Sequence, residues 1–226
     1  SGDHFLNDRL VLKLLAAAEN VAAISGYGAG GGAGTVEFLL DLDSEDFGFL
    51  EVNTRLQVEY PVTDQSLHID LVKWQILLFD GREHEIPYER ARRLRFADKD
   101  HAIECRIYAE DPWNGYAPSP GIIRELDLPT FNGVRCDVGF KTGDSVLPHY
   151  DPMIGKIIVY GRDRGECLAR LERALGELYV RGITTNVDQL LEILRHPSFR
   201  DGHYTNRLLD DNRELFAPQA SVRRLV

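Results

Sequence analysis

The stretch Phe49-Leu-Glu-Val-Asn-Thr-Arg-Leu-Gln-Val-Glu-Tyr-Pro61 alternates polar and apolar side chains. In an extended strand, side chains two positions apart point to the same side. The polar side chains would then share one face: they are Glu51, Asn53, Arg55, Gln57 and Glu59. The opposite face would be apolar and suited to a core: it comprises Leu50, Val52, Leu56 and Val58. Such a convergent polar face predicts a functional site, with a solvated amphipathic strand as the alternative.

The residues before this stretch predict a β-hairpin. Residues 35–41 alternate as a strand, and a turn centred on Ser44 leads into a return strand at 47–53. This turn sets Glu37 directly across from Glu51, where the two Cβ atoms would lie about 4.5–5.5 Å apart. Like charges in that position are destabilising, so the sequence predicts a cation between them.

The residue types indicate which cation this would be. Carboxylate oxygens from Glu37 and Glu51, with the side-chain amide of Asn53 beside them, suit Mg²⁺ or Mn²⁺ and not zinc. The glycine-rich segment at 28–34 raises a second possibility, a phosphate-binding loop. No Gly-Lys-Ser/Thr follows it and it joins a helix to a strand, so a flexible connector is the favoured interpretation.

The overall composition excludes several classes of protein. The 226-residue chain has 26 basic and 36 acidic residues, a net charge of −10, which argues against nucleic-acid or anionic-membrane binding as a main role. No apolar run approaches the ~20 residues of a membrane span, and no signal peptide is recognisable. Three widely spaced cysteines fit a reducing compartment. Because the chain starts at Ser1 without an initiator methionine, we expect a fragment or a processed product.

Two helices are predicted in the first part of the chain. Asn7 caps the first, which Gly26 ends. The second begins at Asp64 or Ser66 and runs to Phe79. Its inward positions are expected to be Ile69, Val72, Ile76 and Phe79.

The rest of the chain is predicted to form strands followed by helices. The strand-like runs are 101–110, 121–128, 134–140 and 154–160. Asp163 caps one helix and Asn186 caps another. The buried stripe of the first of these helices comprises Leu168, Leu171, Leu175 and Leu178. Glu104 and Arg106 face the same way on the first strand, and by themselves they predict only a surface ion pair.

Several motifs together resemble a known family. Three occur in the first part of the chain: Gly34-Thr-Val-Glu-Phe38, Leu50-Glu-Val-Asn-Thr-Arg-Leu-Gln-Val-Glu-Tyr-Pro-Val-Thr63 and Asp70-Leu-Val-Lys73. Five occur in the second: His101-Ala-Ile-Glu-Cys-Arg-Ile107, Ala109-Glu-Asp-Pro112, Pro118-Ser-Pro-Gly121, Tyr150-Asp-Pro-Met-Ile-Gly-Lys156 and Gly182-Ile-Thr-Thr-Asn-Val-Asp188. They resemble the carboxyl-terminal half of biotin carboxylase, in the family's order. The resemblance implies an α+β fold, in which the C-terminal half of an ATP-grasp domain precedes the biotin carboxylase C-terminal domain.

The resemblance also implies domain bounds and a reaction. The ATP-grasp part is expected at 1–82, a linker at 83–98, the C-terminal domain at 99–210 and a tail at 211–226. In the family's reaction, ATP phosphorylates bicarbonate to carboxyphosphate, and the carboxyl group then passes to N1′ of biotin on a carrier domain.

Roles for the individual residues follow from the resemblance. Glu37, Glu51 and Asn53 would hold the divalent cations that bridge the ATP phosphates, in agreement with the hairpin argument.

The other polar residues would act on the substrates. Arg55, Gln57 and the main chain at Val58 would hold bicarbonate, and Glu59 would be the general base that takes its proton. Arg106 would bind biotin and stabilise its enolate.

The sequence departs from the family pattern in four places. Tyr60 stands where the family usually has His, and the segments at 28–34 and 41–46 are longer than usual. The amino-terminal half, with the lysines and histidines that grip ATP, has no counterpart in this sequence. We therefore expect the isolated chain to be inactive.

Partners and location are also implied by the resemblance. They are a biotin carboxyl carrier domain, a carboxyltransferase subunit or domain, and further copies of the chain in a homo-oligomer, with Arg135 at a contact between copies. The location would be the cytoplasm, or the mitochondrial matrix in a eukaryote. Two alternatives stay open, a different ATP-grasp ligase and a non-catalytic scaffold that binds a carrier domain or dimerises. The final carboxyl acceptor is not specified by these residues.

Overall fold

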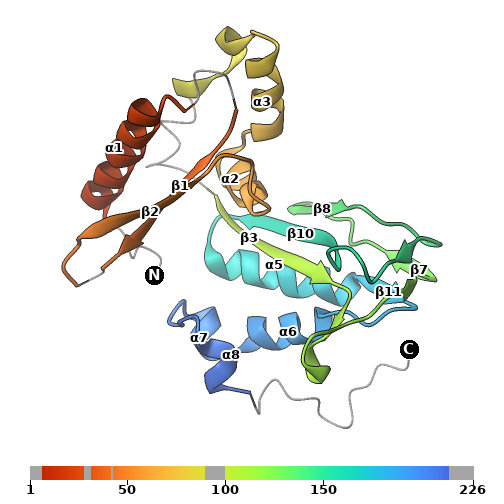
Figure 1. The fold of residues 1–226 in the computed structure, drawn as a ribbon. Helices are drawn as coiled ribbons and strands as arrows, with labels where there is room; N and C mark the ends of the chain where they lie inside the picture. Colours follow the sequence, from red (N-terminus) through yellow and green to blue (C-terminus); the bar gives the residue numbers. More distant parts are fainter. Residues whose placement is uncertain (1–6, 28–31, 42, 90–99, 214–226) are drawn as a thin grey trace. The chain divides into compact units, whose positions relative to one another are not determined.

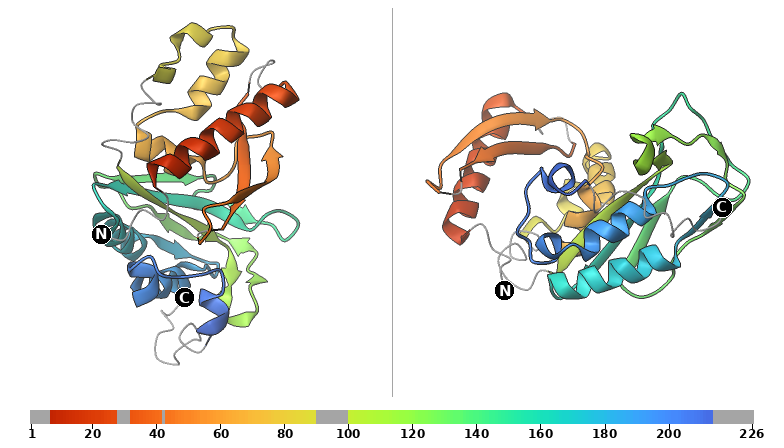
Figure 2. Two further views of the ribbon diagram at one scale, coloured as in Figure 1. Left: turned by 90° about the vertical axis from the view of Figure 1, so that its left-hand side faces the viewer. Right: turned by 90° about the horizontal axis from the view of Figure 1, so that it is seen from below.

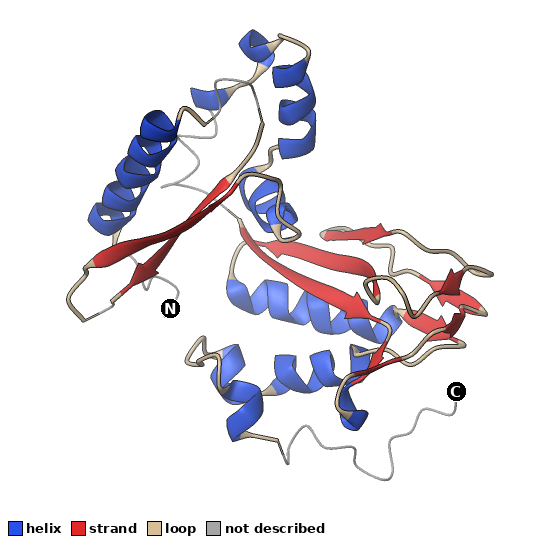
Figure 3. Cartoon of the chain, in the orientation of Figure 1, coloured by secondary structure: helices blue, strands red, loops and turns tan. Residues whose placement is uncertain are grey.

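The computed structural model describes residues 7–27, 32–41, 43–89 and 100–213 (Figure 1). The chain divides into two compact units, Ser1–Asp100 and His101–Val226, and each is described by itself. Both units contain helices and strands, which confirms the α+β class (Figure 3). The predicted linker and tail, and the glycine-rich segment, lie only partly within the described residues.

The first unit begins with the helix that the sequence predicts. Helix α1 spans Asp8–Ser25. The Asn7 side chain accepts a hydrogen bond from the Leu10 N–H at 2.9 Å, which satisfies one of the unpaired donors of the first turn. Gly26 ends the helix at φ 68°, a left-handed conformation that glycine adopts without a steric penalty. Both predicted ends of this helix are confirmed.

An antiparallel hairpin follows. It consists of β1 (Thr35–Leu40) and β2 (Phe47–Asn53). Glu37 pairs with Glu51 in its register, so the predicted opposition of the two carboxylates is confirmed.

A β-bulge interrupts the hairpin directly after this pair. Phe38 is opposite Phe49, which leaves Leu50 as the extra residue of β2. The bulge breaks the alternation of side chains, and Leu50 is 59% exposed. The prediction that Leu50 faces a core is therefore wrong.

The second strand of the hairpin is shorter than predicted. β2 ends at Asn53 because β1 begins at Thr35, opposite Asn53, and offers no residue to pair with later positions. A loop follows, and then helix α2 (Tyr60–Leu67), with Pro61 in the first turn, where its missing N–H removes no helical hydrogen bond. The prediction of one extended polar face over 51–59 is wrong.

The single helix predicted to end at Phe79 is in fact two helices. Helix α3 spans Leu71–Phe79 and is separate from α2. The chain breaks at His68, which has φ 52°, and Asp70 caps the new helix by accepting the Lys73 N–H at 2.8 Å.

This break also changes which side of the helix is covered. Leu77 is the buried residue of α3, whereas Ile76 and Phe79 are 64% and 66% exposed and Val72 is 39% exposed. Because α3 is a separate helix with its own axis, the side of α3 that is buried differs from the side that one continuous helix would bury. The predicted inward positions Val72, Ile76 and Phe79 are wrong.

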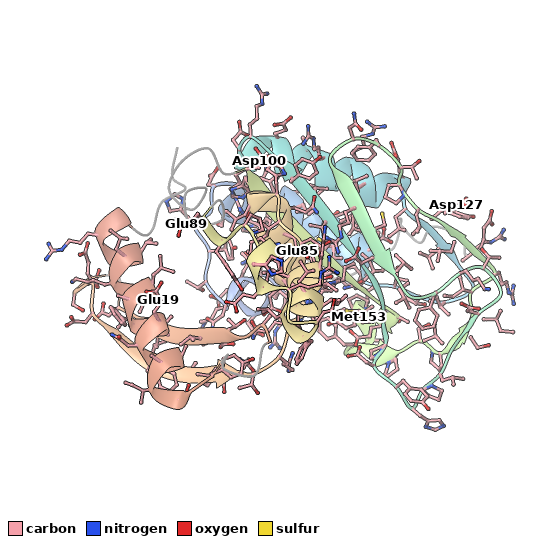
Figure 4. All side chains as sticks on the ribbon, turned by 90° about the horizontal axis from the view of Figure 1, so that it is seen from above. Glu19, Glu85, Glu89, Asp100, Asp127 and Met153 are labelled. Carbon is pink, nitrogen blue, oxygen red and sulfur yellow. The ribbon has the colours of Figure 1, made fainter. Side chains whose placement is uncertain are left out.

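The second unit contains a three-stranded antiparallel sheet in the order β3-β10-β8. Its strands are β3 (His101–Tyr108), β10 (Met153–Gly161) and β8 (Val134–Val138). Met153, the first residue of β10, is labelled in Figure 4. Helix α5 (Arg164–Glu177) lies along one face of this sheet (Figures 1 and 2).

The core of the second unit lies between α5 and the sheet. The predicted leucine stripe is confirmed, since Leu168, Leu171, Leu175 and Leu178 are each 5% exposed or less. Ile157 and Val159 of β10 are fully buried in the same cluster. The predicted cap of α5 is confirmed as well, because Asp163 accepts the Glu166 N–H at 2.8 Å.

Shorter elements complete the two units. The first unit contains the 3₁₀ turn η1 (Glu83–Glu85). The short strands of the second unit are β4 (Glu110–Asp111), β5 (Ala117–Pro118), β6 (Gly121–Ile122), β7 (Glu125–Asp127), β9 (Ser145–Val146) and β11 (Tyr179–Arg181). Its remaining helices are η2 (Pro112–Asn114), α6 (Val187–Arg195), α7 (Pro197–Arg200) and α8 (Leu208–Asp211). In the described residues, no helix is long and apolar enough to cross a membrane.

The run predicted as one strand at 121–128 is divided into β6 and β7. The Ile123 N–H donates to the Asp144 carbonyl, whereas the Arg124 N–H donates to the Arg181 carbonyl. Because adjacent residues pair with different segments, a single ladder cannot form. β6 pairs with β9, and β7 pairs with β11.

Candidate functional site

The opposed carboxylates of the hairpin form the centre of the candidate site. The Asn53 side-chain amide donates to Glu37 Oε1 at 2.7 Å and to Glu51 Oε1 at 3.2 Å. Gln57 Nε2 donates to the same Glu37 oxygen at 2.9 Å. Two amide groups therefore offset the repulsion between the carboxylates, and the structure brings these four predicted residues together.

This set of side chains fits a hard divalent cation. Glu37 and Glu51 offer carboxylate oxygens from adjacent strands, and Asn53 can present its amide oxygen by rotating the group that now donates. In the described part of the chain, no cluster of three or more His, Cys, Asp or Glu residues forms a metal site. Three donors leave room for water or phosphate oxygens, as is usual for Mg²⁺ in nucleotide sites.

The loop after β2 holds the other predicted residues of the first unit. Arg55 is exposed, and its guanidinium donates to the Leu56 carbonyl at 3.3 Å. Glu59 is exposed and stands at the N-cap of α2, where its carbonyl accepts the Val62 N–H at 3.1 Å. Val58, which lies between Arg55 and Glu59 in the loop, is half-buried. Side chains on such a loop can close on a ligand without disturbing a strand ladder.

The hairpin turn and the α1 connection support the position of these groups. Asp41 Oδ1 accepts the N–H groups of Asp43 at 2.9 Å and Ser44 at 3.4 Å, and these bonds lower the pKa of the Asp41 carboxyl.

At the other end of the hairpin, the Tyr27 hydroxyl donates to the Ala33 carbonyl at 2.7 Å. A Cβ at Gly34 would lie 2.6 Å from the Tyr27 ring and 3.1 Å from the Asn53 carbonyl. Gly34 therefore lets the tyrosine approach the end of β2. No pattern in the sequence predicts this role for Tyr27, because a lone tyrosine after a helix is a common surface residue.

Arg106 lies on β3 of the second unit. Its Nε is 3.7 Å from Glu104 Oε1, and the Glu104 side chain is only 4% exposed. The Lys156 Nζ lies 3.9 Å from both Glu104 Oε2 and Asp137 Oδ2, and Asp137 pairs with Arg135 at 2.8 Å. The predicted surface ion pair is thus part of a charged network across the three strands, in which fixed charges hold one another in place.

Each of the two units matches the model of a known protein family. Residues 3–85 match the carbamoyl-phosphate synthase L chain, ATP binding domain, which makes the first unit part of an ATP-grasp fold. Residues 104–211 match the biotin carboxylase C-terminal domain. The chain therefore contains a biotin carboxylase C-terminal domain, preceded by part of an ATP-grasp domain, and is similar to biotin carboxylases over both units.

Individual relatives show the same likeness. The chain is 43% identical over 184 residues to a biotin carboxylase of Halalkalibacterium halodurans, covering 79% of this chain and 38% of that protein. It is 40% identical over 182 residues to the mitochondrial methylcrotonoyl-CoA carboxylase subunit alpha of Glycine max, covering 80% of this chain and 24% of that protein.

A solved structure is similar over nearly the whole chain. It is the biotin carboxylase domain of Hydrogenobacter thermophilus 2-oxoglutarate carboxylase in complex with MgADP and bicarbonate. The TM-score is 0.85 and the identity 33%, over 96% of this chain and 46% of that one. The chain thus spans less than half the length of each of these relatives.

Proposed function

We propose that this chain supplies part of the active site of a biotin carboxylase, which uses ATP to carboxylate carrier-bound biotin with bicarbonate. The observation that carries the proposal is the Glu37–Glu51 pair with Asn53 across it. Like charges directly opposite are destabilising, and the amide groups of Asn53 and Gln57 remove only part of the repulsion, so this pair favours a bound cation. A relative of 33% identity is named as a complex with MgADP and bicarbonate, which supports the same assignment here.

The first group of residues acts on ATP. Glu37, Glu51 and Asn53 would hold Mg²⁺ or Mn²⁺, which neutralises charge on the phosphates when bound. Hydrogen bonds from Asn53 and Gln57 keep the Glu37 carboxylate oriented in the meantime. Orientation before binding reduces the entropy that is lost on binding.

The second group acts on bicarbonate. The Arg55 guanidinium would pair with two of its oxygens, and Gln57 with the main chain at Val58 would complete the contacts. Glu59 would accept the bicarbonate proton as general base. Glu59 is exposed at the start of α2, so its carboxylate is accessible to a substrate that binds at the loop between β2 and α2.

Arg106 of the second unit would contact biotin. A fixed guanidinium supplies positive charge where negative charge develops on the acceptor, at no reorganisation cost during reaction. The partners that follow from this function are a biotin carboxyl carrier domain, a carboxyltransferase that uses the product, and further copies of the chain in a homo-oligomer.

The experiment is Glu59→Gln in the intact enzyme that contains this chain. We expect biotin-dependent turnover to fall by about 10²- to 10⁴-fold, while ATP affinity changes little, because only proton transfer is removed. Turnover is measured as bicarbonate-dependent phosphate release and ATP affinity by equilibrium binding. Glu83→Gln, an exposed isosteric change in the same unit, is the control and should leave both quantities unchanged.

Three outcomes would contradict the proposal. Unchanged turnover in Glu59→Gln would remove Glu59 from the role of base. ADP release triggered by a carboxylic acid and not by bicarbonate would indicate a different ATP-grasp ligase. Binding of a biotin carrier domain without any ATP cleavage by the intact protein would indicate a scaffold.

A further inference from the structure

Asn186 stands at the N-cap of α6, but its side chain does not cap the helix. It is 8% exposed and points to β3 instead. Its Oδ1 accepts the Tyr108 N–H at 2.9 Å, and its Nδ2 donates to the Arg106 carbonyl at 3.1 Å. The Asn186 main-chain N–H also donates to the Tyr108 carbonyl at 3.2 Å. The sequence-based prediction of the cap position is confirmed, and the prediction of side-chain capping is wrong.

These three hydrogen bonds replace a missing strand. β3 is at the edge of the sheet, with β10 on its other side. A side-chain amide has a donor and an acceptor arranged like those of a peptide group, so Asn186 pairs with β3 on both sides of Ile107. The loss of such a buried hydrogen-bond partner lowers the free energy of unfolding, because main-chain groups are left without hydrogen bonds.

The pairing with β10 is irregular at the same place. The register shifts between Met153 and Gly155, opposite Tyr108 and Ile107. A bulge of this type bends a strand and disrupts its ladder. Arg106 itself pairs in register with Lys156, but the main chain directly after it is held less regularly by β10, and there Asn186 supplies hydrogen bonds from the other edge.

We propose that Asn186 is a positioning residue for Arg106. Its amide fixes the main chain that carries Arg106, while the Glu104 carboxylate, 3.7 Å from Arg106 Nε, attracts the guanidinium itself. The inference rests on the proposed function, in which Arg106 contacts biotin. A displacement of about 1 Å at a reacting centre costs up to about 10²-fold in rate, so a small shift of β3 should be visible in the transfer step.

The test uses Asn186→Asp and Asn186→Ala in the intact enzyme, with free biotin as acceptor. Asn186→Asp keeps the acceptor for the Tyr108 N–H and removes the donor to the Arg106 carbonyl. We expect kcat/KM for biotin to fall about tenfold or more in both variants. Bicarbonate-dependent ATP cleavage measured without biotin should stay within about twofold, because Arg106 takes no part in it.

Ser119→Ala is the matched control. Ser119 Oγ accepts the Thr184 N–H at 2.8 Å, so this change removes a hydrogen bond from the segment that carries Asn186 without touching the Arg106 main chain. We expect a decrease in Tm similar to that of Asn186→Asp, with both activities lowered equally or not at all. A selective loss of biotin transfer in Ser119→Ala would overturn the inference.

Further outcomes separate this inference from the proposed function. A parallel decrease in both activities of Asn186→Asp, no decrease, or a failure of both Asn186 variants to fold would make Asn186 a purely structural residue. Arg106→Ala tests the proposed function alone: if it leaves biotin transfer intact, Arg106 does not contact biotin and the proposed role of Arg106 fails. A selective loss in Arg106→Ala with none in Asn186→Asp would refute only the role of Asn186.

Discussion

The two units of the chain differ in how much apolar surface they bury. The cluster of buried apolar residues in the described chain lies wholly in the second unit, between α5, α6 and the sheet. In the described part of the first unit, the buried apolar side chains are Leu10, Pro61, Leu77 and Ile86. The candidate metal and bicarbonate residues nevertheless lie in that first unit. Within this chain, which spans less than half the length of the relatives it matches, the unit with more of the proposed chemistry has less of the buried apolar surface.

The exposed apolar residues show the same contrast. Leu39 and Phe49 on the hairpin are 73% and 55% exposed, and Ile76 and Phe79 on α3 are 64% and 66% exposed. Burial of apolar surface contributes about 25 cal/mol per Å², so the first unit obtains little stability from these side chains. Its structure depends more on helix caps and on the pairing of β1 with β2. We infer that its stability is the more easily changed by polar substitutions.

The largest expected effect is in the core of the second unit. Leu171→Ala removes a fully buried side chain of α5 and should lower the free energy of unfolding of that unit by about 2–5 kcal/mol. The chain's two tryptophans, Trp74 and Trp113, lie in different units and serve as separate probes. In a Trp74→Phe background, the Trp113 fluorescence in urea measures the change.

Leu50→Ala is the matched control in the first unit. Leu50 is 59% exposed at the hairpin bulge, so its loss should change the free energy of unfolding by about 0.5 kcal/mol or less. Trp74 fluorescence in a Trp113→Phe background measures it. Equal losses in the two variants would contradict this contrast between the units, because Leu50 would then have to be buried in solution.

A second prediction concerns alkaline pH. Burial raises the pKa of the Cys105 thiol to about 12, with a smaller contribution from the nearby Glu104 carboxylate. In the unfolded chain this thiol ionises near pH 9, so between pH 9 and 12 the unfolded state binds fewer protons than the folded state. The free energy of unfolding of the second unit should fall by up to about 1.4 kcal/mol per pH unit in that range.

All three cysteines of the chain lie in the second unit, so a slope that arises from a buried thiol belongs to that unit. The Trp113 signal should report it, and Cys105→Ala should leave the pH dependence of the Trp74 signal unchanged. Cys105→Ala should be less stable at pH 7 but should show a flatter dependence above pH 9. The same slope in wild type and Cys105→Ala would show that other groups cause it.

Local patterns in the sequence predicted the elements whose causes are local. The first helix has its cap and its glycine within the segment itself, and the hairpin register follows from a short turn, so α1 and the Glu37–Glu51 pair were predicted correctly. The leucine stripe of α5 has the helical period and was also predicted correctly.

The errors arose where distant segments decide the structure. The end of β2 depends on where β1 starts, and alternation alone continued the strand through Arg55 to Glu59. The side chain of Asn186 forms hydrogen bonds with β3, about 80 positions earlier in the chain. Rules for helix caps consider only neighbouring residues, so they do not predict this contact. The approach of Tyr27 to Gly34 and to the end of β2 likewise depends on residues outside the helix that precedes Tyr27. The family resemblance identified residue types for the site, and their contacts came from the structure.

The smallest expected effect would separate stability from function in the first unit. Glu51→Gln removes one charge of the opposed pair and keeps its shape, so it should raise the free energy of unfolding in metal-free buffer by about 0.2–1 kcal/mol. In wild type, Mg²⁺ should stabilise the unit by binding between the carboxylates, and in Glu51→Gln this gain should be lost. Trp74 fluorescence in urea, with and without Mg²⁺, measures both changes. If Glu51→Gln destabilised the metal-free unit, repulsion between the two carboxylates would not be the dominant effect at this pair, because the hydrogen bond from Asn53 to Glu51 would then outweigh it.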